Sequence, residues 1–185
     1  MKTIAIYCAS SDKIHPDYFA DARQLATLLV KAGYAIVNGG GRMGLMGEIN
    51  TAAIEAGGSA TGVIPRFMDE AGRAHTALTR KIVTEDMHTR KRTMASMASA
   101  VIALPGGVGT FEEVTEIMTW QKLGLFHGPV IILNTRGYYD PLIEMLRRSI
   151  TEGFTSPRSQ RGWHIVSTPA QALEAIQTSL PLNRQ

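Results

Sequence analysis

Residues 100–110 have the sequence Ala-Val-Ile-Ala-Leu-Pro-Gly-Gly-Val-Gly-Thr, and this stretch decides the expected fold. Ala100–Leu104 is a short apolar run typical of a buried strand, and Pro105 and the glycines after it indicate a turn. Phe111–Leu123 continues with the spacing of an amphipathic helix. A buried strand, a tight loop and a helix form the repeating unit of a parallel sheet covered by helices.

The same alternation extends along the whole chain. Strand-like runs occur at Thr3–Tyr7, Tyr34–Val37, Ser59–Ile64, Lys81–Thr84, Ala100–Leu104, Val130–Leu133 and His164–Ser167. Helical spacing of apolar residues lies between them, at 19–29, 49–56, 87–97 and 142–149, and Pro169 opens a last helix. The pattern predicts an α/β fold with a mostly parallel sheet of about seven strands flanked by helices. We expect a single domain over 1–185, because no repeat or low-complexity linker interrupts the alternation.

Two polar segments interrupt this alternation. Arg66–Arg80 and Phe154–Gly162 are irregular in sequence, and the first is long enough to be a functional loop or lid. Ligands of parallel sheets bind at loops beyond the carboxyl ends of the strands. Both segments are therefore expected to be loops that could border a site.

Composition excludes several classes of protein. The 185 residues are 44% apolar and 19% charged, which is ordinary globular usage, and the apolar runs are too short to span a bilayer. The N-terminus lacks the long apolar region of a signal peptide. Cys8 is the only cysteine, so an internal disulfide is impossible and a reducing cytoplasm is expected. The net charge of +3 weakly favours anionic ligands, and the basic run Arg90–Arg92 is too short to predict nucleic-acid binding.

Two glycine-rich loops are candidate phosphate sites. Gly39–Gly47, which contains Gly40 and Gly41, follows the second expected strand, and Pro105–Thr110 follows the fifth. Glycine lets backbone N–H groups approach an anion, and the start of a helix adds unpaired donors. A P-loop is excluded because neither loop has its lysine, and a dinucleotide fingerprint should follow the first strand instead. Tight strand-to-helix turns remain the alternative interpretation of these glycines.

Thr110 and Glu113 have two interpretations. Their Thr-x-x-Glu spacing is that of a capping box, in which Thr110 caps the helix and Glu113 bonds back to it. The other interpretation is catalytic. Breaking an N-glycosidic bond passes through a sugar cation that a carboxylate stabilises while it positions water. A phosphate in the loop would hold the ribose near Glu113, with Glu112 as a helper or a solvent-facing partner of the helix dipole.

The segment before the fifth strand is Met87-His88-Thr89-Arg90-Lys91-Arg92-Thr93-Met94. A set of basic and apolar residues shares one face of this helix, namely Met87, Arg90, Lys91, Met94 and Met97. A basic pair between apolar neighbours is unusual for a solvated face. A planar guanidinium suits phosphate or carboxylate recognition.

The chain resembles the LONELY GUY (LOG) family, the cytokinin riboside 5′-monophosphate phosphoribohydrolases, which are often labelled lysine decarboxylases. Met-His-x-Arg-Lys-x-x-Met matches at 87–94 and Pro-Gly-Gly-x-Gly-Thr-x-x-Glu at 105–113, as do the Gly39–Gly47 loop and the pair Thr119-Trp120. The resemblance implies a Rossmann-like, three-layer homodimer that hydrolyses N6-modified AMP to free base and ribose 5-phosphate, without metal or cofactor.

The resemblance also implies site residues. Arg90 and Glu113 are the expected catalytic residues, and Arg90 is given an electrostatic role because its guanidinium stays protonated. The expected substrate-binding residues are Lys91, Gly106, Gly107, Val108, Gly109, Thr110, Glu112, Thr119, Gly40, Gly41 and Met87. None of the five histidines forms a ligand cluster with acids or Cys8 in the sequence.

Departures and rival functions remain open. Family members often have Cys-Gly-Ser-Ser after the first strand, where this chain has Cys8-Ala9-Ser10-Ser11. Arg66–Arg80 does not align securely with the segment that supplies a substrate-contacting glutamate in plant members; Glu70 is the nearest candidate. The rivals are a broader nucleosidase acting on AMP or other nucleoside monophosphates, and a nucleotide-binding or molybdenum-cofactor carrier protein. Sequence does not rank the bases or separate cytokinin production from nucleotide salvage.

Overall fold

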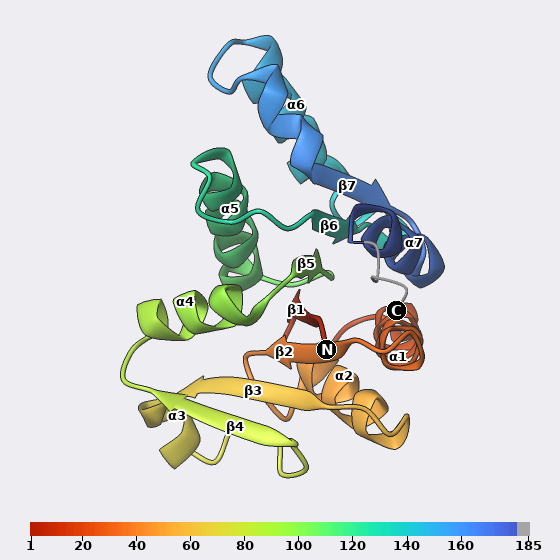
Figure 1. Ribbon diagram of the computed structural model, residues 1–185, viewed down its shortest axis with the longest axis vertical. Coiled ribbons are helices and arrows are strands. Elements are labelled where there is room, and N and C mark those ends of the chain that lie inside the picture. The colour runs from red at the N-terminus through yellow and green to blue at the C-terminus, as the bar shows by residue number, and fades with distance from the viewer. Residues whose placement is uncertain (181–185) are drawn as a thin grey trace.

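The computed structural model describes residues 1–180, except for the side chains of Gln160 and Arg161. Seven strands form one sheet in the order β4-β3-β2-β1-β5-β6-β7, and every neighbouring pair is parallel (Figure 1). The strands are β1 (Thr3–Tyr7), β2 (Ala35–Asn38), β3 (Ala60–Pro65), β4 (Arg80–Thr84), β5 (Ala100–Ala103), β6 (Val130–Leu133) and β7 (Trp163–Val166). The predicted α/β fold with a parallel sheet of seven strands is confirmed.

Helices cover both faces of the sheet (Figure 1). One face carries α1 (Pro16–Lys31), α2 (Gly44–Glu55) and α7 (Pro169–Ser179). The other face carries α4 (Met87–Met97), α5 (Val108–Lys122) and α6 (Asp140–Thr151). Three shorter helical segments complete the described chain, namely α3 (Arg66–Glu70), η1 (Thr135–Gly137) and η2 (Pro157–Gly162).

The central strand β1 shows why two cores form. Its side chains alternate between the faces of the sheet, so that Ile4 and Ile6 pack in one apolar cluster and Ala5 and Tyr7 in the other. All four residues are almost completely buried. A strand that is buried on both faces becomes a continuous apolar run, which is why the sequence indicates the strands so clearly.

The strand order places a crevice between β1 and β5. The chain forms β1 to β4 outward in one direction, then returns to place β5 beside β1, with Tyr7 paired to Ala103. Just beyond these strands the Ala9 N–H donates to the Pro105 carbonyl at 3.1 Å. The loops after β1 and β5 leave the sheet toward opposite faces at this point, and such a reversal is where open α/β sheets bind ligands.

The segment 66–80 is more ordered than expected. It contains α3 and begins β4, so the prediction of an irregular loop was wrong for Arg66–Glu70. A five-residue helix is too short to produce an apolar period that sequence can reveal. The segment also pairs with the first glycine-rich loop through an antiparallel bridge between Gly41 and Ala74. Phe154–Gly162 likewise contains the helical turn η2.

No helix within residues 1–180 combines the length and the apolar character needed to cross a membrane. In the same part of the chain, no group of three or more His, Cys, Asp or Glu side chains is placed to hold a metal ion.

Candidate active site

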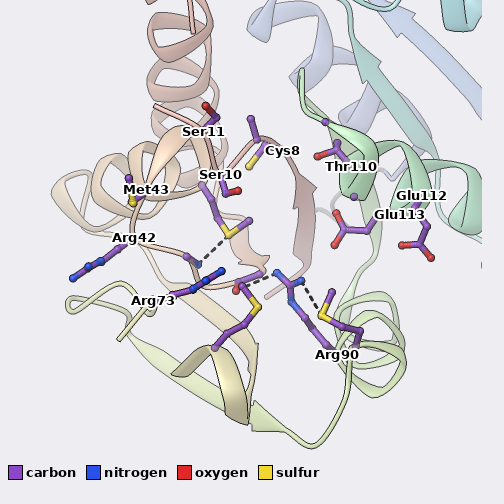
Figure 2. A pocket seen from close by; sticks show the side chains of 18 of the residues that line it. Cys8, Ser10, Ser11, Arg42, Met43, Arg73, Arg90, Thr110, Glu112 and Glu113 are labelled. Carbon is purple, nitrogen blue, oxygen red and sulfur yellow. Dashed lines mark hydrogen bonds between the residues drawn. The ribbon is translucent and has the colours of Figure 1, made fainter. Parts of the chain in front are cut away.

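A cavity of about 660 Å³ lies at the carboxyl edge of the sheet, beside the β1–β5 crevice (Figure 2). Its walls come from the loops after β1 and β2, from the end of α3 and the residues after it, and from the first turns of α4 and α5. The lining residues are Cys8, Ala9, Ser10, Ser11, Gly39, Gly41, Arg42, Met43, Met46, Met68, Ala71, Arg73, Met87, Arg90, Gly107, Gly109, Thr110, Glu112 and Glu113. Five segments that are distant in sequence therefore share one cavity.

The start of α5 supplies free backbone donors to this cavity. The helix begins at Val108, its N-cap is Gly107, and no side chain caps it. The first N–H groups of a helix have no partner within the helix, so they are available to an anion. Gly107 and Gly109 are exposed, and no atom lies within 4 Å of where a Cβ would sit on either one.

This geometry corrects the expected capping box. Thr110 lies in the first turn of α5 and is buried, with its side chain beneath Gly106. A Cβ on Gly106 would lie 2.1 Å from the Thr110 hydroxyl oxygen. The interpretation that Thr110 caps the helix and that Glu113 reaches back to it was wrong, because the N-cap is Gly107, three residues before Thr110. The Glu113 carboxyl is thereby left for another role.

Arg90 enters the cavity from α4 and is only 6% exposed. Its Nε donates to the Val63 carbonyl at 3.0 Å and its Nη2 to the Gly39 carbonyl at 3.3 Å. Over residues 1–180 these backbone acceptors fix the guanidinium without any ion pair to a carboxylate. Two uncharged acceptors orient the group and leave its positive charge for a ligand.

Gly39 makes room for that guanidinium. A Cβ at this position would lie 1.7 Å from Arg90 Nη2, well inside any contact distance. The first glycine-rich loop therefore supports Arg90 rather than presenting open donors to the cavity.

Glu113 lies in the second turn of α5 and is half-buried. Burial raises the pKa of this carboxyl from an ordinary 4.5 to about 7, although the Arg90 guanidinium pulls it down; Glu112 adds to the rise. Figure 2 shows the Glu113 carboxyl and the Arg90 guanidinium directed into the same cavity from α5 and α4. A carboxyl that titrates near neutrality can exchange a proton with a substrate or a water at working pH.

Lys91 is outside the cavity lining and bonds to two acids of α5. Its Nζ contacts the Glu112 carboxylate and lies 3.1 Å from Glu116 Oε1. The side chain is almost fully buried, and burial lowers its pKa, but the bonds from Glu112 and Glu116 outweigh that effect and raise it. Lys91 is therefore a cation at neutral pH with both of its acidic partners on one helix.

The structure gathers most of the residues expected from sequence. Those lining the cavity are Gly41, Met87, Arg90, Gly107, Gly109, Thr110, Glu112 and Glu113. Those outside the lining are Gly40, Lys91, Gly106, Val108 and Thr119, and their expected contacts with a nucleotide stay predictions. Val108 points outward with 82% exposure, and the Thr119 hydroxyl donates to the Thr115 carbonyl at 2.8 Å.

Sequence reasoning missed two further parts of the wall. Ser10 and Ser11 follow β1, and Arg73 lies after α3. Figure 2 shows Arg73 extending toward the cavity and Arg42 running outward from its loop. The serines could have been found from the rule that loops after adjacent parallel strands meet, but only with the strand order known. Arg73 lies in Arg66–Arg80, the segment expected from sequence to border a site, but no motif singles out this residue.

The topology and the cavity define an α/β protein in which an uncapped helix start, an arginine and a half-buried acid surround one cavity. A family model described as "Possible lysine decarboxylase" matches residues 46–176. A cytokinin riboside 5′-monophosphate phosphoribohydrolase of Rhodococcoides fascians is 36% identical over 178 residues, covering 96% of this chain and 90% of that protein. One from Arabidopsis thaliana is 40% identical over 168 residues, covering 91% and 76%. The chain belongs to this family, the LONELY GUY proteins.

Solved structures share the fold. A molybdenum cofactor binding protein of Rippkaea orientalis superimposes with a TM-score of 0.74 at 24% identity, over 96% of each chain. A molybdenum cofactor carrier protein of Chlamydomonas reinhardtii gives 0.74 at 23% identity over 97% of each. At this identity the likeness establishes the Rossmann-like architecture alone.

Proposed function

We propose that this chain is an N-glycosyl hydrolase that cleaves N6-modified adenosine 5′-monophosphate, such as isopentenyladenine riboside 5′-monophosphate, into free base and ribose 5-phosphate. The observation that carries the proposal is one cavity that holds the Glu113 carboxyl, the Arg90 guanidinium and an uncapped helix start. The names of the relatives from Rhodococcoides fascians and Arabidopsis thaliana support the substrate.

The start of α5 orients the substrate. The 5′-phosphate accepts hydrogen bonds from the N–H groups at 107–110, where glycines leave open space and the helix dipole favours an anion. Held there, the ribose lies one helical turn from Glu113. Fixing the phosphate in this way positions the anomeric carbon for reaction, so part of the binding energy serves catalysis.

Glu113 and Arg90 act on the glycosidic bond. As the bond from C1′ to the base nitrogen breaks, its electron pair leaves with the base and the ribose gains positive charge, which the Glu113 carboxylate stabilises. Water adds its hydroxyl to C1′, and the proton that it loses passes by way of Glu113 to the departing base. Arg90 stays charged and fixes the anionic substrate beside the acid.

The assembly is proposed to be a homodimer. Large apolar side chains are exposed where α5 ends and around α6, with Leu123 at 64%, Leu125 at 69%, Met145 at 62% and Phe154 at 78%. Such a group of exposed apolar side chains is typical of an interface between protein chains. A mass in solution near twice 20.1 kDa is expected, and a mass near 20.1 kDa would contradict the dimer. A free, buried Cys8 supports the cytoplasmic setting expected from sequence.

The decisive experiment compares substrates. Purified protein is incubated with isopentenyl-AMP, AMP, GMP, CMP and UMP, and free base and ribose 5-phosphate are separated by chromatography. We expect release from isopentenyl-AMP, and we expect Glu113→Gln to abolish it while nucleotide binding persists. Glu174→Gln, an exposed glutamate on α7 at the opposite face of the sheet, is the matched control that keeps activity.

The outcomes separate the rival functions. Comparable release from AMP or from other nucleotides would indicate a broad nucleosidase. Nucleotide binding with no ribose 5-phosphate from any of the five would refute the hydrolase and leave a carrier, which needs no Glu113 carboxyl.

A further inference from the structure

A three-residue ion cluster joins α4 to α5 beside the cavity, and one of its members, Glu112, lines the cavity. It consists of Lys91 on α4 with Glu112 and Glu116 on α5. Lys91 follows Arg90 in the chain, and Glu112 precedes Glu113. Each member of the proposed catalytic pair therefore has a cluster residue as its immediate neighbour, on the two helices that carry the pair.

The burial of Lys91 makes this cluster a constraint rather than a chance surface contact. Its side chain is 7% exposed, whereas those of Glu112 and Glu116 are 51% and 28% exposed. A buried ammonium is stable only with partners that replace its water, so α4 must keep α5 within hydrogen-bond reach. Two of the three N–H donors of Lys91 are directed at these carboxylates, which compete with a nucleotide phosphate for its charge.

The cluster also changes the electrostatic surroundings of Glu113. From α4, Arg90 and Lys91 favour its charged form; from α5, Glu112 and Glu116 oppose it. The remaining titratable neighbours are Tyr7 and Cys8 on and after β1 and Tyr139 before α6, and all three stay neutral because burial raises their pKa values. Lys91 is thus one of two cations that offset two acids beside the reacting carboxyl.

We propose that Lys91 is a positioning residue, which ties α4 to α5 through Glu112 and Glu116 and balances their charge beside Glu113. This inference rests on the proposed hydrolase, because it assigns Lys91 a role in preparing Glu113 instead of contacting the nucleotide. The pair Arg90–Glu113 keeps its spacing only while the neighbouring pair Lys91–Glu112 holds.

Two substitutions in the cluster should move the pH dependence of hydrolysis in opposite directions. Lys91→Met removes a cation, so the acid limb of the kcat/KM profile moves up by about half a pH unit or more. Glu116→Gln removes an acid, so the acid limb moves to lower pH. It does so even though this variant, like Lys91→Met, loses the ion pair between Lys91 and Glu116. Lys91→Arg keeps the charge and should restore the wild-type limb. Loss of packing alone would lower activity in the first two variants without moving their limbs in opposite directions.

A second readout follows Glu113 without turnover. In protein labelled with ¹³C-glutamate, the Glu113 carboxyl resonance, assigned as the one lost in Glu113→Gln, is titrated by NMR in wild type and in each variant. The midpoints should order as Glu116→Gln, then wild type, then Lys91→Met, from low to high pH. If Lys91→Met does not fold, the inference is still tested by the lower Glu113 midpoint expected in Glu116→Gln and the wild-type midpoint expected in Lys91→Arg.

Other results would overturn the inference. A rise in KM for isopentenyl-AMP in Lys91→Met, with the pH limb and the Glu113 midpoint unchanged, would make Lys91 a direct nucleotide contact. An unchanged Glu113 midpoint in Glu116→Gln would refute the inference that the cluster balances charge beside Glu113. Failure of the hydrolase itself is a separate observation, since wild type would then release no ribose 5-phosphate while the NMR titration could still show the predicted order.

Discussion

The two glycine-rich loops are similar in sequence but have different roles in the structure. In Gly39–Gly47, added Cβ atoms would collide with the Arg90 guanidinium at Gly39, with the backbone after β1 at Gly44 and with the Arg42 carbonyl at Gly47. In Pro105–Thr110, Gly107 and Gly109 face open space. Gly39, Gly44 and Gly47 of the first loop are therefore required by close packing, whereas Gly107 and Gly109 of the second loop leave room for a ligand. The alternative of tight structural turns fits the first loop, and the phosphate site fits the second.

Gly44→Ala should give the largest effect on stability and tests the packing role of the first loop. Gly44 has φ +61°, and its Cβ would lie 2.5 Å from the Ser10 carbonyl carbon. A left-handed alanine and a backbone collision together should destabilise the fold by about 3–5 kcal/mol. Thermal or denaturant unfolding measures this loss. A variant as stable as wild type would show that the loop has room to move.

Glu113→Gln should give the next largest change in stability, and it tests the acid that follows the second loop. Because burial raises its pKa from 4.5 to about 7, the folded state favours the neutral acid, and stability falls as the pH rises from about 4.5 to about 7 and is level above that. Glutamine cannot ionise, so the variant should match wild type at pH 4 and exceed it by about 2 kcal/mol at pH 8, after allowance for partial exposure. Unfolding at both pH values checks the difference; equal stabilities at pH 8 would contradict the buried-acid description.

Gly39→Ala separates positioning from folding in the first loop. The added Cβ meets the end of a flexible side chain, so Arg90 can move and the fold should lose only about 1 kcal/mol. Activity should fall by about 100-fold or more, since a small misplacement of a binding group is costly. Steady-state kinetics and unfolding measured together test this; unchanged kcat/KM would separate Arg90 from catalysis.

Gly109→Ala should have the smallest effect on stability, and it should stabilise the fold where the other two glycine substitutions destabilise it. Alanine favours the helix interior by about 0.5–1 kcal/mol, and no neighbour lies within 4 Å of its Cβ. The same methyl group enters the space assigned to the phosphate, so the affinity for AMP should weaken. Calorimetric titration with AMP and thermal unfolding give the two values. Tighter AMP binding by this variant would place the phosphate elsewhere.

Most of the fold was predictable because parallel strands buried on both faces appear as continuous apolar runs. Thr3–Tyr7 and Val130–Leu133 have the predicted limits, and the ends of the other strands differ by at most one residue, since hydrogen bonding rather than apolarity ends a strand. The five-residue α3 was missed because it buries no side chain and so has no period to detect. The order of the strands is a property of long-range packing that no local pattern contains.

The candidate site was predictable to the extent that its residues lie in contiguous motifs. Arg90 and Glu113 meet in the cavity because each motif places its residue on the first turns of a helix beside β5. The capping interpretation of Thr110 failed because Thr-x-x-Glu spacing does not say which residue starts the helix. The partners of Lys91 depend on how two helices pack, and Ser10 joins the wall only because β1 lies next to β5. Neither fact is local in sequence.

The uniform direction of the strands has a practical consequence for handling the molecule. The residues that line the cavity follow the carboxyl ends of the strands, and the turns that lead back into the strands lie at the opposite, amino edge. Gly33 and Gly57 sit in two of these turns, with open space around the position of a Cβ. Dyes, affinity tags or surface linkers attached there would be separated from the reaction by the full length of the strands. This edge is therefore a suitable place to immobilise the enzyme or to fuse it to another domain.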